Sequence, residues 1–446
     1  MNEKQEKAVK QNGNVLVIAG AGSGKTYTIV KKINYLIENN IYKPNEILVI
    51  SFTNESVNDL KRKINHDLKI YTFHKLAITL LNDSNYKIIP NNYLEYIIDE
   101  FFETYTKLNK KIKKSVKRLL TETNKSTLKN TIYTFINLYK SNYININKLI
   151  NLYKKSLFIN KDYFLIILAI YKIYENELNS SNTYDFNDLI IKATTNIENN
   201  LIQTNYKYII IDEFQDTSQI RFNLIHAILK QNNGNLFVVG DDYQSIYRFS
   251  GCNLDIFLNI KRIIKDLTII NLDYNYRNSK EIITVANTFI MKNKKQIPKN
   301  TICLKNINKP IKIYYYNNEK TIVNRILNNI NTNYLILGRN NKDKTTFNIK
   351  ENFLTIHKSK GLEEENIILV NLQNNNTSIP TKIINHKIID KIILKDAYPY
   401  EEERRLFYVA LTRTKNYIHM AVPYNNKSIF IKELLKNYKD YIEIIK

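Results

Sequence analysis

The stretch that most constrains this chain is residues 15–26, which read VLVIAGAGSGKT. Its first four residues are apolar and fit a buried strand, and a run of small residues then breaks the pattern. Glycines let the backbone curl until several N–H groups face one anion, and the positive end of a following helix points at the same place. The segment therefore predicts a phosphate-binding loop between a strand and a helix, rather than an ordinary glycine-rich turn with an incidental lysine.

Two side chains of this loop have distinct expected roles. Lys25 can reach the β- and γ-phosphates of a nucleotide, and the hydroxyl of Thr26 can bind Mg²⁺. The residues expected to contact the nucleotide phosphates are Ala19, Gly20, Ala21, Gly22, Ser23, Gly24, Lys25 and Thr26.

The charge balance favours a polyanionic partner. The 446 residues include 66 lysines and arginines but only 42 aspartates and glutamates, which gives a formal net charge of +24. This surplus fits nucleic acid, although a general bias toward lysine, asparagine and isoleucine could also produce it.

The cysteine content and the hydropathy favour an intracellular, cytoplasmic protein. Cys252 and Cys303 have neither the spacing of a metal site nor that of a disulfide framework. The N-terminal residues are charged and have no apolar signal core, and no apolar run is long enough to span a membrane. We therefore expect no membrane partner.

Two further strands end in residues that complete a nucleotide site. The apolar residues 208–211 are followed directly by Asp212 and Glu213. Asp212 is expected to hold Mg²⁺ and Glu213 to polarise the attacking water. Residues 236–239 predict another strand, and the amide of Gln244 follows it, where it could sense the γ-phosphate.

Other segments predict a nucleic-acid surface. Residues 47–50 and 70–74 read as strands, and the carboxyl ends of parallel strands point at the ligand crevice. Tyr247 and Phe249 would face one side of an extended segment and could stack on bases.

A glycine-free stretch at 76–182 shows long helical patterns and predicts a helical insertion. Seven basic residues lie within 107–118, which indicates either a solvated helix face or a face that follows phosphates.

Taken together, the motifs resemble those of the UvrD/Rep/PcrA group of superfamily I DNA helicases. The resemblance rests on residues 19–26, DEFQDTS at 212–218, GDDYQSIYRF at 240–249, NYR at 275–277, TIHKSKGLE at 355–363 and EEERRLFYVALTR at 401–413. It departs from the group where Phe249 replaces a common tryptophan and where Tyr274 replaces a glutamine.

The resemblance implies an α/β fold with two RecA-like parallel-sheet domains of the phosphate-loop type and one helical insertion in the first. The expected domains are 1–75 with 183–273, the insertion at 76–182, and the second RecA-like domain at 274–446. Arg277 and Thr355 are separated by 78 residues, which suffices only for one lobe. The second helical insertion of larger members is therefore expected to be absent.

The resemblance also implies roles for individual residues. Gln5 is expected to read adenine, Tyr276 to stack on it and Glu363 to contact the ribose. The catalytic residues would be Lys25, Asp212, Glu213, Gln244, Arg277 and Arg413. The residues expected to contact the DNA strand are Phe52, Thr53, Asn54, Thr72, His74, Tyr247, Phe249, Thr355 and His357.

The implied activity is an ATP-dependent 3′→5′ DNA helicase that uses ATP and Mg²⁺ and binds single-stranded DNA and its junctions with duplex. The alternatives are a translocase without efficient unwinding and a non-catalytic nucleic-acid-binding subunit. The motifs leave open DNA or RNA, and repair, replication or recombination.

Overall fold

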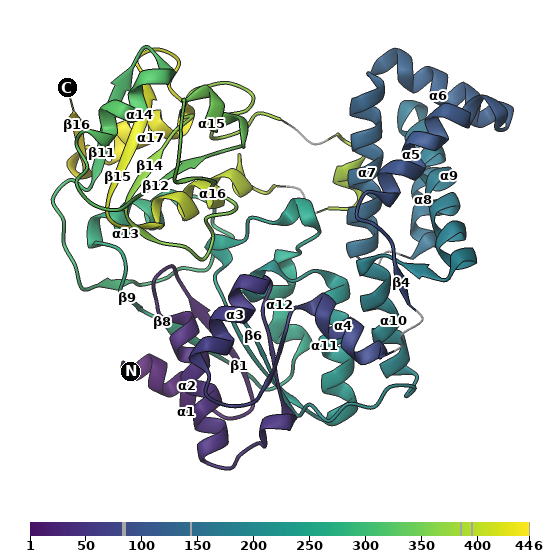
Figure 1. Ribbon diagram of the computed structural model, residues 1–446, viewed down its shortest axis with the longest axis horizontal. Coiled ribbons are helices and arrows are strands. Elements are labelled where there is room, and N and C mark those ends of the chain that lie inside the picture. The colour runs from purple at the N-terminus through teal and green to yellow at the C-terminus, as the bar shows by residue number, and fades with distance from the viewer. Residues whose placement is uncertain (83–85, 143–144, 384–385, 394–395, 446) are drawn as a thin grey trace.

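The protein is built of two sheet-containing lobes and one helical body (Figure 1). The computed structural model describes residues 1–82, 86–142, 145–383, 386–393 and 396–445. Each lobe contains a six-stranded sheet in which every strand pair is parallel. This confirms the expected α/β class with two RecA-like lobes. Among the described residues, no helix has both the length and the apolar character that crossing a membrane requires.

The sheet of the first lobe has the strand order β3-β2-β6-β7-β1-β8. The strands predicted at 47–50 and 208–211 are confirmed, as is the strand that precedes the phosphate loop. The strand bounds are β1 Asn14–Ala19, β2 Ile47–Ile50, β3 Lys69–Tyr71, β6 Tyr208–Ile211, β7 Asn235–Gly240 and β8 Leu267–Leu272.

Helices cover both faces of this sheet because successive strand residues point to opposite sides. In β1, Val15 and Val17 join the core under α1, α2 and α3, whereas Leu16 and Ile18 join the core under α4, α10, α11 and α12. The helix bounds are α1 Glu3–Lys10, α2 Lys25–Glu38, α3 Asn54–Lys63, α4 Phe73–Leu81, α10 Phe186–Glu198, α11 Gln219–Asn232 and α12 Leu254–Ile263.

The helical insertion has its own apolar core and joins the first lobe through a short parallel ribbon of β4 with β5. Helix α4 crosses the boundary expected at 75–76, and it packs on the first sheet with α10. The bounds are β4 Lys87–Ile88, α5 Tyr93–Thr104, α6 Lys110–Glu122, α7 Lys125–Ser141, α8 Ile146–Lys155, α9 Phe158–Ser181 and β5 Thr183–Tyr184.

The sheet of the second lobe has the order β13-β12-β14-β15-β11-β16. Helices α13, α16 and α17 cover one face, and α14 covers the other. The bounds are α13 Lys280–Ile290, β11 Ile311–Tyr316, α14 Glu319–Leu327, β12 Tyr334–Gly338, α15 Lys342–Thr346, β13 Phe353–Thr355, β14 Glu364–Leu369, α16 Glu401–Leu411, β15 Thr414–Pro423, α17 Ile429–Asn437 and β16 Ile442–Ile445. Residues 278–354, all of them described, form only elements of this lobe and its connection, so no second helical body lies there.

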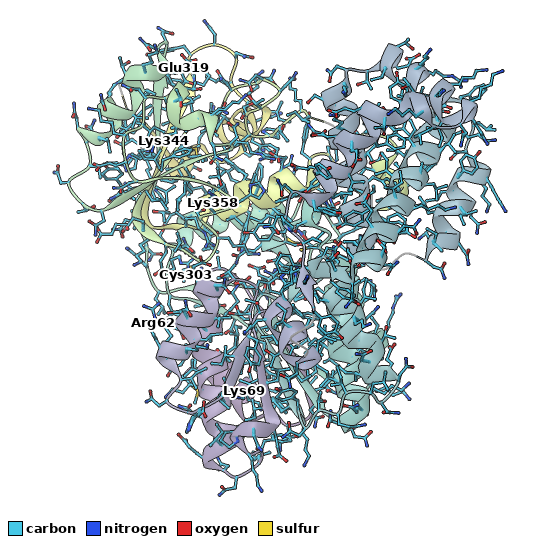
Figure 2. All side chains as sticks on the ribbon, turned by 45° about the vertical axis from the view of Figure 1, so that its right-hand side comes forward. Arg62, Lys69, Cys303, Glu319, Lys344 and Lys358 are labelled. Atoms are coloured by element: carbon cyan, nitrogen blue, oxygen red, sulfur yellow. The ribbon has the colours of Figure 1, made fainter. Side chains whose placement is uncertain are left out.

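Two further segments lie between the bodies. The strands β9 (Tyr274–Asn275) and β10 (Ile302–Cys303) pair where the chain passes between the lobes, and Figure 2 shows Cys303 at this waist. On the other side, residues 386–392 of the second lobe, here called the clasp, reach the insertion. Ile388, Ile389 and Ile392 are buried in the core of the insertion.

Candidate functional site

The phosphate loop lies between β1 and α2. Gly22 and Gly24 have positive φ values of 68° and 82°, which side chains rarely allow, and Gly24 is the N-cap of α2. A Cβ on Gly22 would lie 2.7 Å from the Cβ of Arg277, and one on Gly24 would lie 2.8 Å from Nε2 of Gln5. The loop therefore needs glycine for conformation and for close contact with both the adenine candidate and the second lobe.

A cavity of about 480 Å³ opens at this loop and is lined by both lobes. The first lobe contributes Ala21, Gly22, Ser23, Gly24, Lys25, Thr26, Tyr27, Glu213 and Gln244. The second contributes Tyr276, Arg277, Lys305, Gly361, Glu363, Glu365, Arg413, Lys415 and Asn416.

The paired acids follow β6 and lie beside the loop lysine. Nζ of Lys25 is 3.0 Å from Oε1 of Glu213, and Oδ1 of Asp212 accepts a hydrogen bond from the backbone N–H of Glu213 at 2.8 Å. Burial opposes the charge on Glu213, but the ammonium groups of Lys25 and Lys360 outweigh it and lower its pKa. Burial and the charge on Glu213 raise the pKa of Asp212 to about 7. A divalent cation at Asp212 would stabilise its charged form, which fits the expected Mg²⁺ ligand.

Two arginines of the second lobe face the same cavity. Arg413 is 1% exposed, and its Nη2 donates to Oε1 of Gln244 in the first lobe at 3.2 Å. Arg277 pairs with Glu363 at 2.5 Å and donates from Nη1 to the carbonyl of Thr412 at 3.2 Å. Burial and the charge of Arg277 lower the pKa of Arg413 to about 9, so an anion between these two guanidinium groups would be stabilised.

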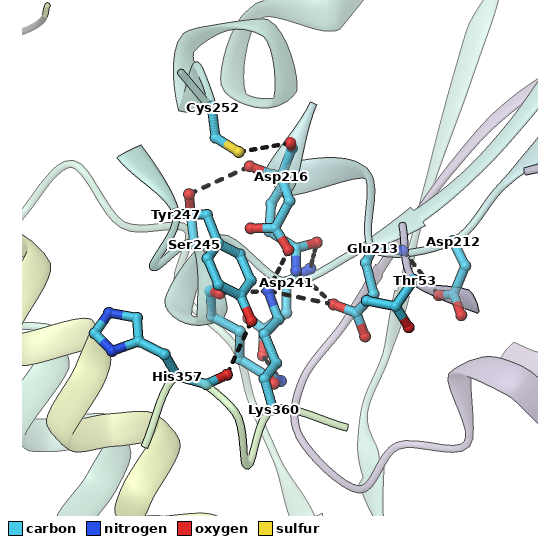
Figure 3. Close-up of polar contacts among 12 residues, drawn as sticks. Thr53, Asp212, Glu213, Asp216, Asp241, Ser245, Tyr247, Cys252, His357 and Lys360 are labelled. Atoms are coloured by element: carbon cyan, nitrogen blue, oxygen red, sulfur yellow. Dashed lines mark hydrogen bonds and ion pairs between the residues drawn. The ribbon is translucent and has the colours of Figure 1, made fainter. Parts of the chain in front are cut away.

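Lys360 also bridges the lobes, and the sequence interpretation assigned it no role. It follows β13 in the second lobe and donates from Nζ to the carbonyl of Gln244 at 2.8 Å. It pairs with Asp216 and lies 3.7 Å from Oε2 of Glu213 (Figure 3). Its position in the motif at 355–363 was a signal, but its partners lie more than a hundred residues away.

Of the candidates for the base and ribose, Tyr276 and Glu363 line the cavity, whereas Gln5 is buried against the phosphate loop. Nε2 of Gln5 donates to the carbonyl of Ser23 at 3.3 Å, so the amide touches the phosphate loop. Tyr276 is half exposed, and its hydroxyl accepts a hydrogen bond from Asn2 at 2.9 Å. Glu363 lies 3.2 Å from Lys415 as well as beside Arg277.

Two residues of the first lobe that are expected to contact DNA are also the N-caps of helices. Thr53 accepts from the N–H of Ser56 at 3.1 Å and caps α3, whose first residue is Asn54. Thr72 accepts from the N–H of Lys75 at 3.3 Å and caps α4. The prediction of a β-strand over residues 70–74 is therefore wrong beyond residue 71, where β3 ends.

The aromatic candidates of the first lobe pack beside these caps. The ring centroids of Phe52 and Phe73 are 5.4 Å apart, and the guanidinium of Arg221 lies 5.4 Å from the Phe52 ring. His74 lies on α4 with its ring 5.0 Å from that of Phe186, and burial together with Arg221 lowers its pKa to about 4.

A second group of aromatic side chains contains Tyr247 and Phe249 of the first lobe and His357 of the second. The ring of His357 lies 5.4 Å from Phe249 and 6.2 Å from Tyr247, whose hydroxyl donates to the His357 carbonyl at 2.9 Å (Figure 3). The expected extended segment is wrong, because residues 248–250 form a 3₁₀ helix. This turn leaves Phe249 59% exposed. Thr355 ends β13 two residues before His357.

Comparisons with known proteins identify the family. The chain matches the UvrD/REP helicase N-terminal domain over residues 1–265 and the UvrD-like helicase C-terminal domain over residues 333–424. The ATP-dependent DNA helicase Rep of Buchnera aphidicola subsp. Schizaphis graminum is 28% identical, over 100% of this chain and 70% of its own length. DNA helicase IV of Escherichia coli is 28% identical over 98% of this chain and 70% of its own length.

A further relative matches mainly part of the chain. The probable DNA helicase II homolog of Mycoplasma capricolum is 34% identical over 66% of this chain and 41% of its own length. The two family domains match this chain in the same order as its two sheet lobes and at their positions. The chain belongs to the UvrD/REP helicase family.

Proposed function

We propose that this protein hydrolyses ATP with Mg²⁺ to move 3′→5′ along single-stranded DNA and to unwind duplex ahead of it. The observation that supports ATP hydrolysis is the contact of Arg413 with Gln244 at 3.2 Å, beside a cavity that the phosphate loop also lines. Positive groups from the second lobe then stabilise the transferring phosphoryl group, and hydrolysis removes the anion that holds the lobes together. The 3′→5′ direction rests on the resemblance of the motifs alone.

The proposed roles follow the position of each group. Lys25 neutralises the β- and γ-phosphates, and Glu213 orients and polarises the attacking water. Thr26 and Asp212 would hold Mg²⁺, because this cation prefers oxygen ligands and both side chains supply them. Arg277 and Arg413 contact the γ-phosphate.

The experiment measures ATP hydrolysis and duplex unwinding side by side on 3′-tailed, 5′-tailed and blunt DNA duplexes. Hydrolysis should rise with single-stranded DNA, and unwinding should require a 3′ tail. Hydrolysis that ignores DNA, or unwinding from a 5′ tail, would contradict the proposal. RNA of the same sequence tests the choice of nucleic acid.

Lys25→Ala should abolish ATP hydrolysis, because the ammonium that faces the phosphates is lost. The matched control is Lys31→Ala on the same helix, which should retain activity. Unchanged turnover in Lys25→Ala would refute the assigned site, whereas a wild-type protein without ATP hydrolysis would favour the non-catalytic alternative.

A translocase without efficient unwinding is the second candidate. It is favoured by the structure of residues 278–354, which form only the second lobe and its connection. The second helical insertion, which in larger members of the family contacts duplex DNA, is therefore absent from this stretch. Rapid DNA-stimulated hydrolysis with displacement of a DNA-bound protein, but without strand separation, would support this candidate.

A further inference from the structure

The short helix α1 carries the candidate for reading the nucleobase. Oδ1 of Asn2 accepts from the N–H of Gln5 at 2.8 Å, and Oε1 of Gln5 accepts from the N–H of Asn2 at 3.1 Å. Nε2 of Gln5 reaches the carbonyl of Ser23 in the phosphate loop. A helix of eight residues is marginal by itself, so tertiary contacts must decide where α1 lies.

The other end of α1 is held by Lys32, which lies on α2 two turns after Lys25. Its Nζ donates to the carbonyl of Val9 at 2.9 Å and to the carbonyl of Gln11 at 2.6 Å. The last carbonyls of a helix have no partner within it, and a cation there also interacts favourably with the helix dipole. Lys32 therefore stabilises the C-terminal end of α1.

The surroundings of Lys32 make this contact specific. The residue is 0% exposed, and its ammonium lies 5.6 Å from the ring centroids of Tyr35, Tyr208 and Phe237. Burial lowers the pKa of Lys32 to about 8, so the charge is costly at this place. An apolar side chain would fill the space without that cost, but it could not connect α2 to the carbonyls of α1.

We propose that Lys32 is a positioning residue for nucleobase selectivity, because it fixes α1, and with it the amide of Gln5, relative to the phosphate loop. The inference rests on the proposed function, in which Gln5 reads adenine. Helix α2 begins with Lys25 and Thr26, so Lys32 joins the phosphate-binding element and the base-reading element in one unit.

The test compares kcat and KM for ATP and GTP, with DNA present, in Lys32→Met, Lys32→Arg and wild type. Lys32→Met should raise KM for ATP about tenfold, the order expected for losing charge-assisted hydrogen bonds, and lower the ATP-to-GTP ratio of kcat/KM by a similar factor. The kcat should change less than about twofold, since the phosphate contacts remain. Lys32→Arg should restore the ratio, and Lys31→Met is the neighbouring control.

Gln5→Ala separates the failure of this inference from failure of the proposed adenine contact. If Gln5→Ala lowers the ATP-to-GTP ratio and folded Lys32→Met does not, Lys32 has no positioning role. If Gln5→Ala leaves the ratio unchanged, the adenine contact itself is wrong and the inference falls with it. Equal losses for ATP and GTP in Lys32→Met would show a merely structural role. Lys32→Gln replaces Lys32→Met if the latter does not fold.

Discussion

At the scale of single residues, buried charges connect parts of the chain that sequence pattern treats separately. Lys140 of α7 lies 2.9 Å from Glu175, 2.8 Å from Asp185 and 2.7 Å from Asp188. Glu175 belongs to α9, Asp185 is the N-cap of α10 and Asp188 lies in its first turn, so the cluster joins the insertion to the first lobe. Three carboxylates surround one ammonium, and burial together with the charge of Asp185 raises the pKa of Asp188 to about 7.

Asp188→Asn tests the effect of this pKa shift on stability. Because the pKa of Asp188 is raised from 3.8, the folded protein binds more protons than the unfolded chain between that value and about 7. The contribution of Asp188 to stability is therefore complete at low pH and is lost as the pH rises through this window. Asparagine has no such loss, so the thermal midpoint of Asp188→Asn relative to wild type should rise between about pH 5 and about pH 8.

The control for that experiment is Asp255→Asn, whose carboxylate is exposed in the first turn of α12. Its midpoint relative to wild type should stay nearly constant over the same range. A difference for Asp188→Asn that does not change with pH would contradict the assigned shift.

At the scale of elements, the N-termini of α3 and α4 lie at the ends of β2 and β3. Thr53 and Thr72 cap these helices with their hydroxyl oxygens. The positive ends of helices attract anions, so a cap can position a helix terminus at a phosphate without giving up its structural role. Capping also explains why the strand predicted through residue 74 ends early: Thr72 begins a helix whose apolar face packs on the sheet.

Thr53→Ala should destabilise the first lobe by about 1 kcal/mol, because the N–H of Ser56 loses its acceptor. Thr53→Ser should retain most of the stability. The measurement is the denaturant midpoint of the first lobe. Thr79→Ala on the exposed face of α4 is the control and should be nearly neutral. Equal midpoints for Thr53→Ala and wild type would rule out a stabilising cap.

At the scale of the whole molecule, the clasp links the second lobe directly to the insertion. The clasp contributes its buried isoleucines and also His386, whose ring lies 4.3 Å from that of Tyr163 on α9. Nearby, Arg248 of the first lobe pairs with Asp396 and, at 3.1 Å, with Glu402. All three bodies therefore meet here, in addition to the contacts of the two lobes at the nucleotide cavity and of the insertion with the first lobe at Lys140 (Figure 1).

Ile389→Asp should detach the clasp, because it places a carboxylate in the apolar core of the insertion at a cost on the order of 3 kcal/mol. We expect a lower thermal midpoint and faster proteolytic cleavage within residues 386–392. Ile383→Asp is the control, because that side chain is 66% exposed. If both variants behave like wild type, the clasp contributes no stability.

Much of the fold and part of the site could be predicted because their signals are local. The apolar strands at 47–50 and 208–211 and the small residues after β1 determine backbone conformation within a few residues, so these strands and the phosphate loop followed from sequence. The two-lobed α/β class followed from the resemblance of the motifs to the helicase family. The role expected of Gln5 came from the resemblance, and its amide reaches the phosphate loop because α1 packs against α2.

What only the tertiary structure decided are contacts between side chains far apart in the chain. Arg413 and Gln244 are 169 residues apart, and the partners of Lys360 lie 116 and 144 residues away. The hydrogen bonds of Lys32 to α1 and the burial of the clasp likewise depend on how helices and strands pack after they have formed. Local preference determines which helix or strand forms, but the burial of apolar faces determines which of them meet.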